Sequence, residues 1–151
     1  MIVDPDTMPL DLADNGGVTV CRCQGGGLSQ CAAFPEFLLP GGQTSLRRWH
    51  EEAEEFPSVL DGTAALPEDE GPRQIGRATC VCSPAGRDDA HGLRNDGTAP
   101  ATLIIVGSRL AEDPAHYPDI DLHYTRRKGR RTLARKDGPP IPAGHGRWTN
   151  D

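Results

Sequence analysis

The sequence predicts a single all-β domain, a sandwich or barrel of short strands, and three observations support this fold class. The chain has 151 residues, which suits one compact core and leaves no room for two. It contains 18 glycines and 14 prolines, a share that demands many turns and disfavours long helices. Its aliphatic residues occur in short runs with turn signals between them, as in all-β sandwiches and barrels.

The aliphatic runs give the predicted strands in chain order. They are residues 18–23, 32–39, 44–49, 58–60, 63–66, 78–82 and 101–107. Clusters such as GGG, PGG and NDG separate them and predict the turns. We therefore expect a flexible, Asp-rich N-terminal arm over 1–16 and a barrel over 17–110. A basic, Pro/Gly-rich C-terminal tail over 111–151 would wrap the surface or stay mobile.

Charge and hydropathy exclude several classes of partner. Acidic residues outnumber basic ones by 22 to 16, and no apolar run is long enough to span a bilayer. With no leader-like start, we expect a cytoplasmic protein without a membrane partner. The basic stretch 126–136 lacks interleaved aromatic residues, so no nucleic-acid partner is expected. Five cysteines with Cys-x-Cys gaps predict reduced, packed thiols; they are Cys21, Cys23, Cys31, Cys80 and Cys82.

The most informative stretch runs from Gly42 to Gly62, and two local structures are open for it. A helix over 47–56 is one, because the acidic residues 51–55 favour helix and Pro57 would end it. Turn signals on both sides favour the other, in which a strand ends, turns and a new strand begins. Side chains two apart on that strand would share a face, and the turn would return Glu55 beside them.

Spaced glycine, histidine and glutamate residues form two patterns. The first is Gly, five residues, Arg-x-His, four residues, Glu, six residues, Gly, at Gly42, Arg48, His50, Glu55 and Gly62. The second is Pro-x-Gly followed by His-x-x-x-Asn, at Pro84, Gly86, His91 and Asn95. Together they resemble the two motifs of the cupin superfamily, and the resemblance extends over 34–138. It implies a cupin double-stranded β-helix, or jelly-roll, barrel and a homodimer.

Three departures qualify the resemblance. Arg48 stands where the family has its first metal-ligand histidine, and Ala78 stands where the second motif opens with glycine. Four residues instead of two separate Gly86 from His91. The chain therefore resembles a small single-domain bacterial cupin with a degenerate first metal-ligand position.

The resemblance implies one candidate metal site. In metal-binding cupins, three histidines and one glutamate converge on a divalent ion such as iron, manganese, nickel, copper or zinc. His50, Glu55 and His91 would remain here, a two-histidine, one-carboxylate set that suits non-haem Fe(II) and a cupin oxygenase. The other histidines are expected in solvated loops; they are His116, His123 and His145.

Arg48 supports a metal-free alternative, which is the favoured prediction. A guanidinium cannot ligate a metal, whereas pointing inward it can pair with Glu55 and supply positive charge. The alternative is an Arg48 side chain that points out of the barrel to solvent. The pocket would then bind a small organic molecule. His50 and His91 would be base and acid, with Arg48 holding a carboxylate or enolate, in isomerisation, dehydration or cyclisation. A ligand-binding module without chemistry is a third alternative.

Overall fold

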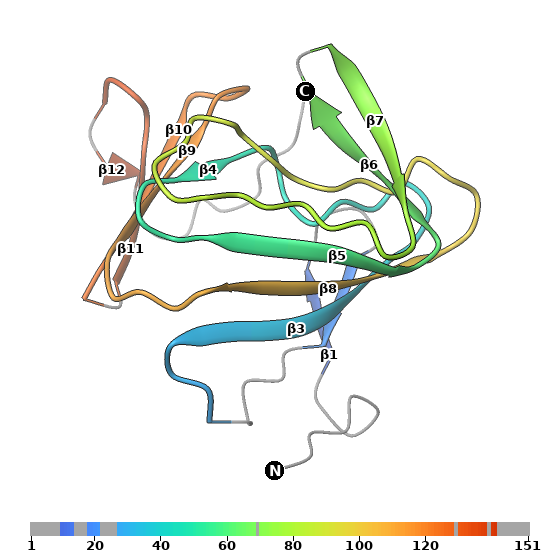
Figure 1. The fold of residues 1–151 in the computed structure, drawn as a ribbon. Coiled ribbons are helices and arrows are strands. Elements are labelled where there is room, and N and C mark those ends of the chain that lie inside the picture. The colour runs from blue at the N-terminus through green and yellow to red at the C-terminus, as the bar shows by residue number, and fades with distance from the viewer. Residues whose placement is uncertain are drawn as a thin grey trace.

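The computed structural model describes residues 10–13, 18–21, 27–68, 70–128, 130–138 and 140–141 of the chain. This described part contains no helix, and therefore none able to cross a membrane. Its strands form two five-stranded sheets and a hairpin, arranged as a jelly roll (Figure 1). The all-β prediction is confirmed. The helix considered over 47–56 is wrong, because strands β4 (Trp49–His50) and β5 (Glu55–Asp61) occupy that stretch.

The first sheet has the strand order β1-β2-β3-β8-β5, with all neighbours antiparallel. Its other strands are β1 (Leu10–Ala13), β2 (Val18–Cys21), β3 (Cys31–Leu38) and β8 (Ala101–Ser108). The segment 78–83 continues this sheet beyond β5. The Val81 and Ser83 N–H groups donate to the Pro57 and Glu55 carbonyls, each at 2.9 Å.

The second sheet has the order β12-β11-β10-β9-β4 and faces the first. Its other strands are β9 (Asp113–Tyr117), β10 (Leu122–Arg127), β11 (Arg130–Ala134) and β12 (Pro140–Ile141). The segment 91–94 extends it beyond β4, through bridges that pair Arg48 with His91 and Gln43 with Arg94. A further bridge from Arg94 to Ala65 joins the hairpin of β6 (Thr63–Glu68) and β7 (Gly71–Gly76).

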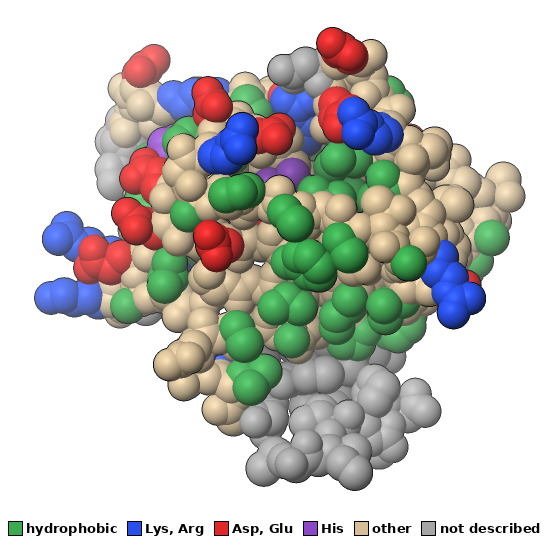
Figure 2. Space-filling model, in the orientation of Figure 1, with side chains coloured by type: hydrophobic (Ala, Val, Ile, Leu, Met, Phe, Trp, Pro, Cys, Tyr) green, Lys and Arg blue, Asp and Glu red, His purple; other side chains and the backbone are tan. Residues whose placement is uncertain are grey.

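The hydrophobic core lies between the sheets and follows the alternation of their strands. On β8, Leu103 and Ile105 are 0% and 8% exposed and point inward. The remaining buried members of the core are Leu38, Val59, Ala64, Ile75, Leu93 and Ala101. Hydrophobic side chains also gather on the outside over β5 and β8, as Figure 2 shows, and Phe56 and Leu60 are among the exposed ones. The homodimer stays a prediction.

The stretch expected to form an irregular tail instead supplies most of the second sheet. Strands β9 to β12 all lie within 111–151, and β9 pairs with β4 at the site motif. Their inward positions lack a run of large apolar residues, because β9 buries Asp113 and Ala115. Residues 142–151 lie outside the described residues. So do residues 1–9 and 14–16 of the expected N-terminal arm, whose residues 10–13 form β1.

One departure from the family motif has a conformational consequence. Ala78, at the glycine position, has a φ of 66°. This left-handed conformation costs a non-glycine residue about 1–2 kcal/mol. Glycine avoids that cost but loses more backbone entropy on folding, which lowers stability by roughly 0.5–1 kcal/mol. We expect Ala78→Gly to raise the free energy of unfolding by about 0.5–1 kcal/mol, seen as a higher urea midpoint. An unchanged or lower midpoint would contradict this.

Gly62 provides the opposite comparison. It has a φ of 76°, and a Cβ there would lie 2.8 Å from the Pro100 carbonyl oxygen. Gly62→Ala should therefore lower the urea midpoint under the same conditions.

Candidate functional site

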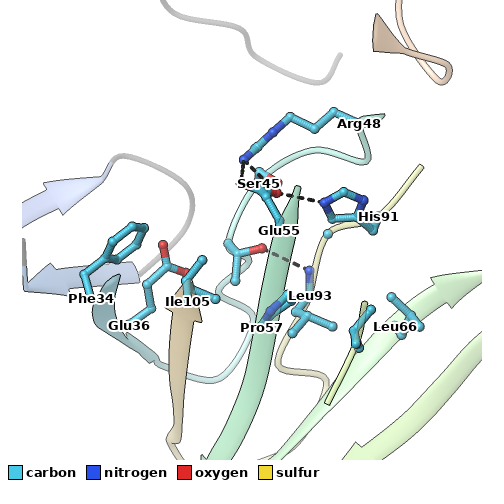
Figure 3. A pocket seen from close by; sticks show the side chains of 13 residues that line it. Phe34, Glu36, Ser45, Arg48, Glu55, Pro57, Leu66, His91, Leu93 and Ile105 are labelled. Atoms are coloured by element: carbon cyan, nitrogen blue, oxygen red, sulfur yellow. Dashed lines mark hydrogen bonds and ion pairs between the residues drawn. The ribbon is translucent and has the colours of Figure 1, made fainter. Parts of the chain in front are cut away.

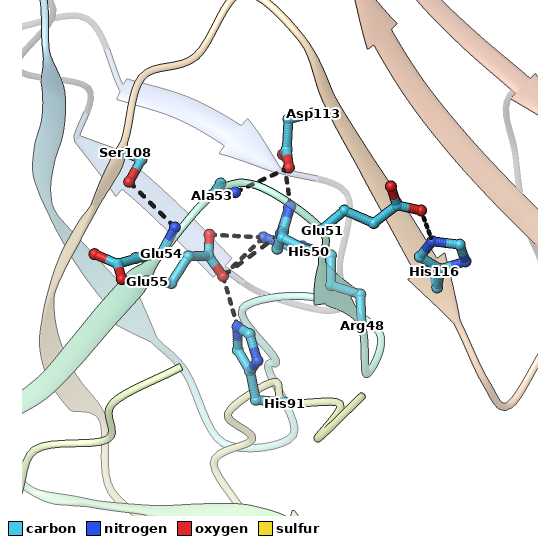
Figure 4. Close-up of polar contacts among 10 residues, drawn as sticks. All are labelled: Arg48, His50, Glu51, Ala53, Glu54, Glu55, His91, Ser108, Asp113 and His116. Carbon is cyan, nitrogen blue, oxygen red and sulfur yellow. Dashed lines mark hydrogen bonds and ion pairs between the residues drawn. The ribbon is translucent and has the colours of Figure 1, made fainter. Parts of the chain in front are cut away.

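Arg48, His50, Glu55 and His91 come together between the two sheets (Figure 4). His50 lies on β4, Glu55 begins β5, and His91 lies on the segment paired beside Arg48. The ring centroids of His50 and His91 are 6.4 Å apart. All four residues are thus close enough to face one small ligand.

Backbone pairing produces this convergence. The Arg48 N–H donates to the His91 carbonyl at 3.0 Å, and the His91 N–H donates to the Arg48 carbonyl at 2.9 Å. Gly92 permits the close approach, since a Cβ there would lie 2.8 Å from the Ser45 carbonyl oxygen. The turn between β4 and β5 then carries the chain from the second sheet to the first and brings Glu55 beside His50.

Arg48 is the centre of the polar network. Its Nε–H donates to His50 Nε2 at 3.0 Å, and its Nη2 donates to Glu55 Oε1 at 3.1 Å. The Arg48 and Glu55 side chains are only 23% and 21% exposed, so this ion pair is largely shielded from water. Within the described part of the chain, no acceptor is paired with Nη1 of Arg48. The guanidinium therefore points inward and keeps donors for a ligand oxygen.

Glu55 is ionised at neutral pH in this setting. Burial opposes its ionisation, but the Arg48 charge and the hydrogen bond from His91 outweigh burial and hold the pKa of Glu55 well below its ordinary value. The His91 Nε2 to Glu55 Oε2 distance is 2.7 Å, which assigns the proton to Nε2 because a carboxylate can only accept. Glu55 consequently acts as a counter-charge and is a poor base.

His50 is neutral and has a carboxylate partner that the sequence did not reveal. Its Nδ1 lies 2.7 Å from Asp113 Oδ2, while its Nε2 accepts from Arg48. Burial, and after it the charge of Arg48, lowers the pKa of His50. Asp113 belongs to neither motif, and only the pairing of β9 with β4 brings it to the site.

A small cavity adjoins the network (Figure 3). Its volume is about 50 Å³, and Arg48, Glu55, His91 and Glu36 provide charged or ionisable groups along it. The apolar part of the wall consists of Phe34, Pro57, Leu66, Val81, Leu93 and Ile105. Pockets that enclose a whole ligand typically measure about 300–1,000 Å³. This cavity therefore suits one end of a small molecule.

The residues present do not fit a divalent metal ion. A metal would need the lone pairs of His50 and His91 and an oxygen of Glu55. The His50 lone pair instead accepts from Arg48, and Glu55 accepts from both Arg48 and His91. A cation would also meet the Arg48 guanidinium at contact distance. In the described residues, no group of three or more histidine, cysteine, aspartate or glutamate side chains is arranged to hold a metal.

Asn95, the last residue of the second motif, has a structural role. Its side chain is fully buried, and its Nδ2 donates to the Leu38 and Ala99 carbonyls, both at 2.9 Å. Its Oδ1 accepts from the Gly97 N–H at 3.0 Å. The second motif therefore contains a site residue, His91, and a structural residue, Asn95, whose hydrogen bonds fix the loop that follows it.

The other histidines differ from expectation where the structure describes them. His116 and His123 lie on β9 and β10 and not in solvated loops. His116 stacks on Trp49 with ring centroids 4.1 Å apart, and its Nε2 is 2.7 Å from Glu51 Oε1. This cluster lies outside the network, and His145 lies outside the described residues.

The prediction of packed thiols is wrong for two of the cysteines. Cys80 and Cys82 were expected to pack, but both are exposed free thiols, because Val81 between them takes the inward position. Cys31 is a partly buried free thiol. Cys23 lies outside the described residues, and Cys21 is described only as part of strand β2.

Comparison with known proteins identifies the family. The family described as Cupin domain matches residues 36–107. A sugar phosphate isomerase of the cupin superfamily from Silicibacter pomeroyi has a crystal structure that matches with a TM-score of 0.84 and 31% identity. The match covers 95% of this chain and 98% of that chain.

More distant structures share the fold. A putative sugar phosphate isomerase from Acidithiobacillus ferrooxidans matches with a TM-score of 0.73 and 24% identity, covering 82% of this chain and 81% of that one. The polyketide cyclase RemF from Streptomyces resistomycificus matches with a TM-score of 0.61 and 18% identity, over 73% and 80% of the two chains. No curated protein matches the sequence. The motifs, the jelly roll and the match along nearly the whole chain lead to one conclusion: the chain belongs to the cupin superfamily.

Proposed function

We propose that this protein is a metal-independent isomerase that moves a proton within a small hydroxy-carbonyl compound bound at Arg48. The observation that carries the proposal is the Arg48 guanidinium, which contacts His50 and Glu55 and keeps Nη1 for a ligand oxygen. A fixed cation of this kind stabilises the oxyanion of an enediolate without a metal.

His50 is the proposed base. In the structure its Nε2 lone pair accepts from the Arg48 Nε–H, and His50 is not among the residues that line the cavity. In the proposed reaction the carbonyl oxygen of the substrate takes over the Arg48 Nε–H. The freed Nε2 then removes the proton from the neighbouring carbon, while that oxygen becomes an enediolate oxygen at Arg48. Asp113, 2.7 Å from Nδ1, stabilises the imidazolium that forms. The proton then returns to the former carbonyl carbon. The hydroxyl proton passes directly between the two enediolate oxygens, because the His91 Nε2–H is held by Glu55, so atoms and electrons balance without a co-reactant.

The cavity favours the carbonyl end of the substrate over an anionic group. Glu36 and Glu55 both line it, and Glu55 already pairs with Arg48. A phosphate beside these carboxyl groups would be repelled. The rest of the substrate therefore lies outside the cavity of about 50 Å³.

Similarity to the Silicibacter pomeroyi sugar phosphate isomerase supports isomerisation over dehydration or cyclisation, since 31% identity extends along nearly the whole chain. We accordingly propose a phosphorylated sugar as substrate, with its carbonyl end inside and its phosphate outside.

The test is incorporation of solvent deuterium into pentose and hexose phosphates, followed by NMR. We expect one of these substrates to exchange and isomerise, and His50→Ala to lower the rate on the order of a hundredfold or more. His123→Ala is the matched control, because His123 lies outside the network. Turnover that survives in His50→Ala, or that is lost on adding a chelator, would contradict the proposal.

A binding module is the second candidate, favoured by the small cavity and by the hydrogen bonds that already engage His50 and Glu55. It predicts thermal stabilisation by the ligand without deuterium exchange. A ligand at a hundred times its Kd adds about 2.7 kcal/mol of stability, so a thermal shift would be measurable.

A further inference from the structure

Asp113 contacts the network from a strand that carries none of the motif residues. It begins β9 and is 8% exposed. Its Oδ2 lies 2.7 Å from His50 Nδ1, and its Oδ1 accepts from the Ala53 N–H at 3.2 Å. With both oxygens engaged, the carboxylate holds a fixed orientation toward the imidazole (Figure 4).

The donor and acceptor roles along this chain of bonds admit one arrangement of protons. A carboxylate only accepts, so His50 Nδ1 carries the hydrogen that faces Asp113. A guanidinium only donates, so His50 Nε2 presents its lone pair to Arg48 Nε at 3.0 Å. The opposite tautomer would set Nε2–H against Nε–H and leave Asp113 facing a lone pair.

We infer that Asp113 is the positioning residue of this site: it holds His50 in the Nδ1–H tautomer and, through His50 Nε2, fixes the Arg48 guanidinium toward the cavity. The bonds run from β9 to β4 and end at Glu55 on β5. The effect of Asp113 on catalysis rests on the proposed function. The His50 tautomer and the orientation of Arg48 do not depend on it.

Other groups around His50 do not substitute for Asp113. Glu55 Oε2 is 3.8 Å from Nε2, on the far side of the ring from Nδ1. His91 has its ring centroid 6.4 Å away and donates to Glu55. Among the described residues, Asp113 is thus the sole acceptor paired with Nδ1.

The experiment compares Asp113→Ala with Ser108→Ala. Both substitutions remove a side-chain acceptor from neighbouring N–H groups of the β4–β5 turn, because Ser108 Oγ accepts from the Glu54 N–H at 3.1 Å. Asp113 also touches His50, whereas the Ser108 hydroxyl is paired, among the described residues, with the turn alone. The readouts are the ¹⁵N shifts of the His50 ring, which report the tautomer, and the solvent exchange of the Arg48 Nε–H.

In the unsubstituted protein we expect His50 as the Nδ1–H tautomer and a protected Arg48 Nε–H. Asp113→Ala should move the ring shifts toward a mixture of tautomers and speed Arg48 exchange at least tenfold, with Ser108→Ala unchanged. An Nε2–H tautomer in the unsubstituted protein, or unchanged signals in Asp113→Ala, would overturn the inference.

Asp113→Asn keeps the experiment decisive if the alanine variant does not fold. Its amide has one acceptor oxygen, so it can serve His50 or Ala53 but not both. We expect either an altered His50 tautomer or faster exchange of the Ala53 amide. If both the tautomer and the Ala53 exchange rate stay unchanged, the inference is overturned. Turnover separates the two proposals. Altered His50 signals with unchanged turnover would leave the positioning role intact and contradict His50 as the base.

Discussion

Replacement of Arg48 by leucine is expected to lower the free energy of unfolding by about 3 kcal/mol, the lower end of the range for breaking a buried ion pair. About a fifth of each partner is exposed, 23% for Arg48 and 21% for Glu55, which keeps the loss from being larger. The loss arises because Glu55 remains charged and shielded from water without its cation. Urea denaturation measures it.

A double-mutant cycle measures the interaction energy between Arg48 and Glu55. Arg48→Leu combined with Glu55→Gln should recover much of the loss, because the orphaned carboxylate is then absent. Arg94→Leu is the matched control: the Arg94–Asp96 pair is exposed at the surface, and such pairs contribute only about 0–1 kcal/mol. Additive losses in the Arg48 and Glu55 variants would contradict the ion-pair account.

The pH dependence of this loss has a definite sign. The pKa of Glu55 is lower in the folded protein than the ordinary glutamate value of 4.5. The ion pair therefore stabilises the protein fully above pH 4.5, and the stabilisation is lost as the pH falls through the depressed folded pKa. The difference between the unsubstituted protein and Arg48→Leu should be constant near neutral pH and shrink in acid.

Replacement of Arg48 by histidine should convert the site to one that binds a divalent metal. It removes a cation that repels the ion by about 4 kcal/mol per unit charge at contact distance, roughly a thousandfold in affinity. It also adds an imidazole on the face shared with His50. Titration with Zn(II), Mn(II), Ni(II) and Fe(II), together with elemental analysis, measures the change.

Arg48→Lys is the control for this gain, because it keeps a positive charge and supplies no new ligand at neutral pH. Near-stoichiometric metal in the unsubstituted protein, or equal affinities in the histidine and lysine variants, would contradict the assignment of Arg48 as the group that excludes the ion.

The motif spacing predicted which residues of the first motif lie close together. Arg48, His50 and Glu55 lie close together because strand alternation and one turn are short-range features that a sequence records directly. His91 required the family resemblance, since its pairing with Arg48 spans a long stretch of chain. The choice between an inward and an outward Arg48 depended on packing, and the structure resolves it as inward.

Asp113 and the second sheet could not be predicted in the same way. The strands β9 to β12 carry polar, basic and proline residues, and β9 buries only a small residue, Ala115, and an acid, Asp113. Such strands lack the apolar alternation on which sequence assignment depends. Their stability comes from pairing with β4 and with one another, which is a property of the assembled sheet.

The network that joins the sheets also bears on how fast a ligand can enter. Arg48 to Glu55 and His50 to Asp113 connect β5, β4 and β9 beside a cavity of about 50 Å³. A ligand that enters by one end, as proposed, meets these bonds already made. A ligand that had to enter whole would bind only after some of them open, and such association is slower than a diffusional encounter. We therefore expect a slower on-rate for a ligand that enters whole than for one that enters by one end.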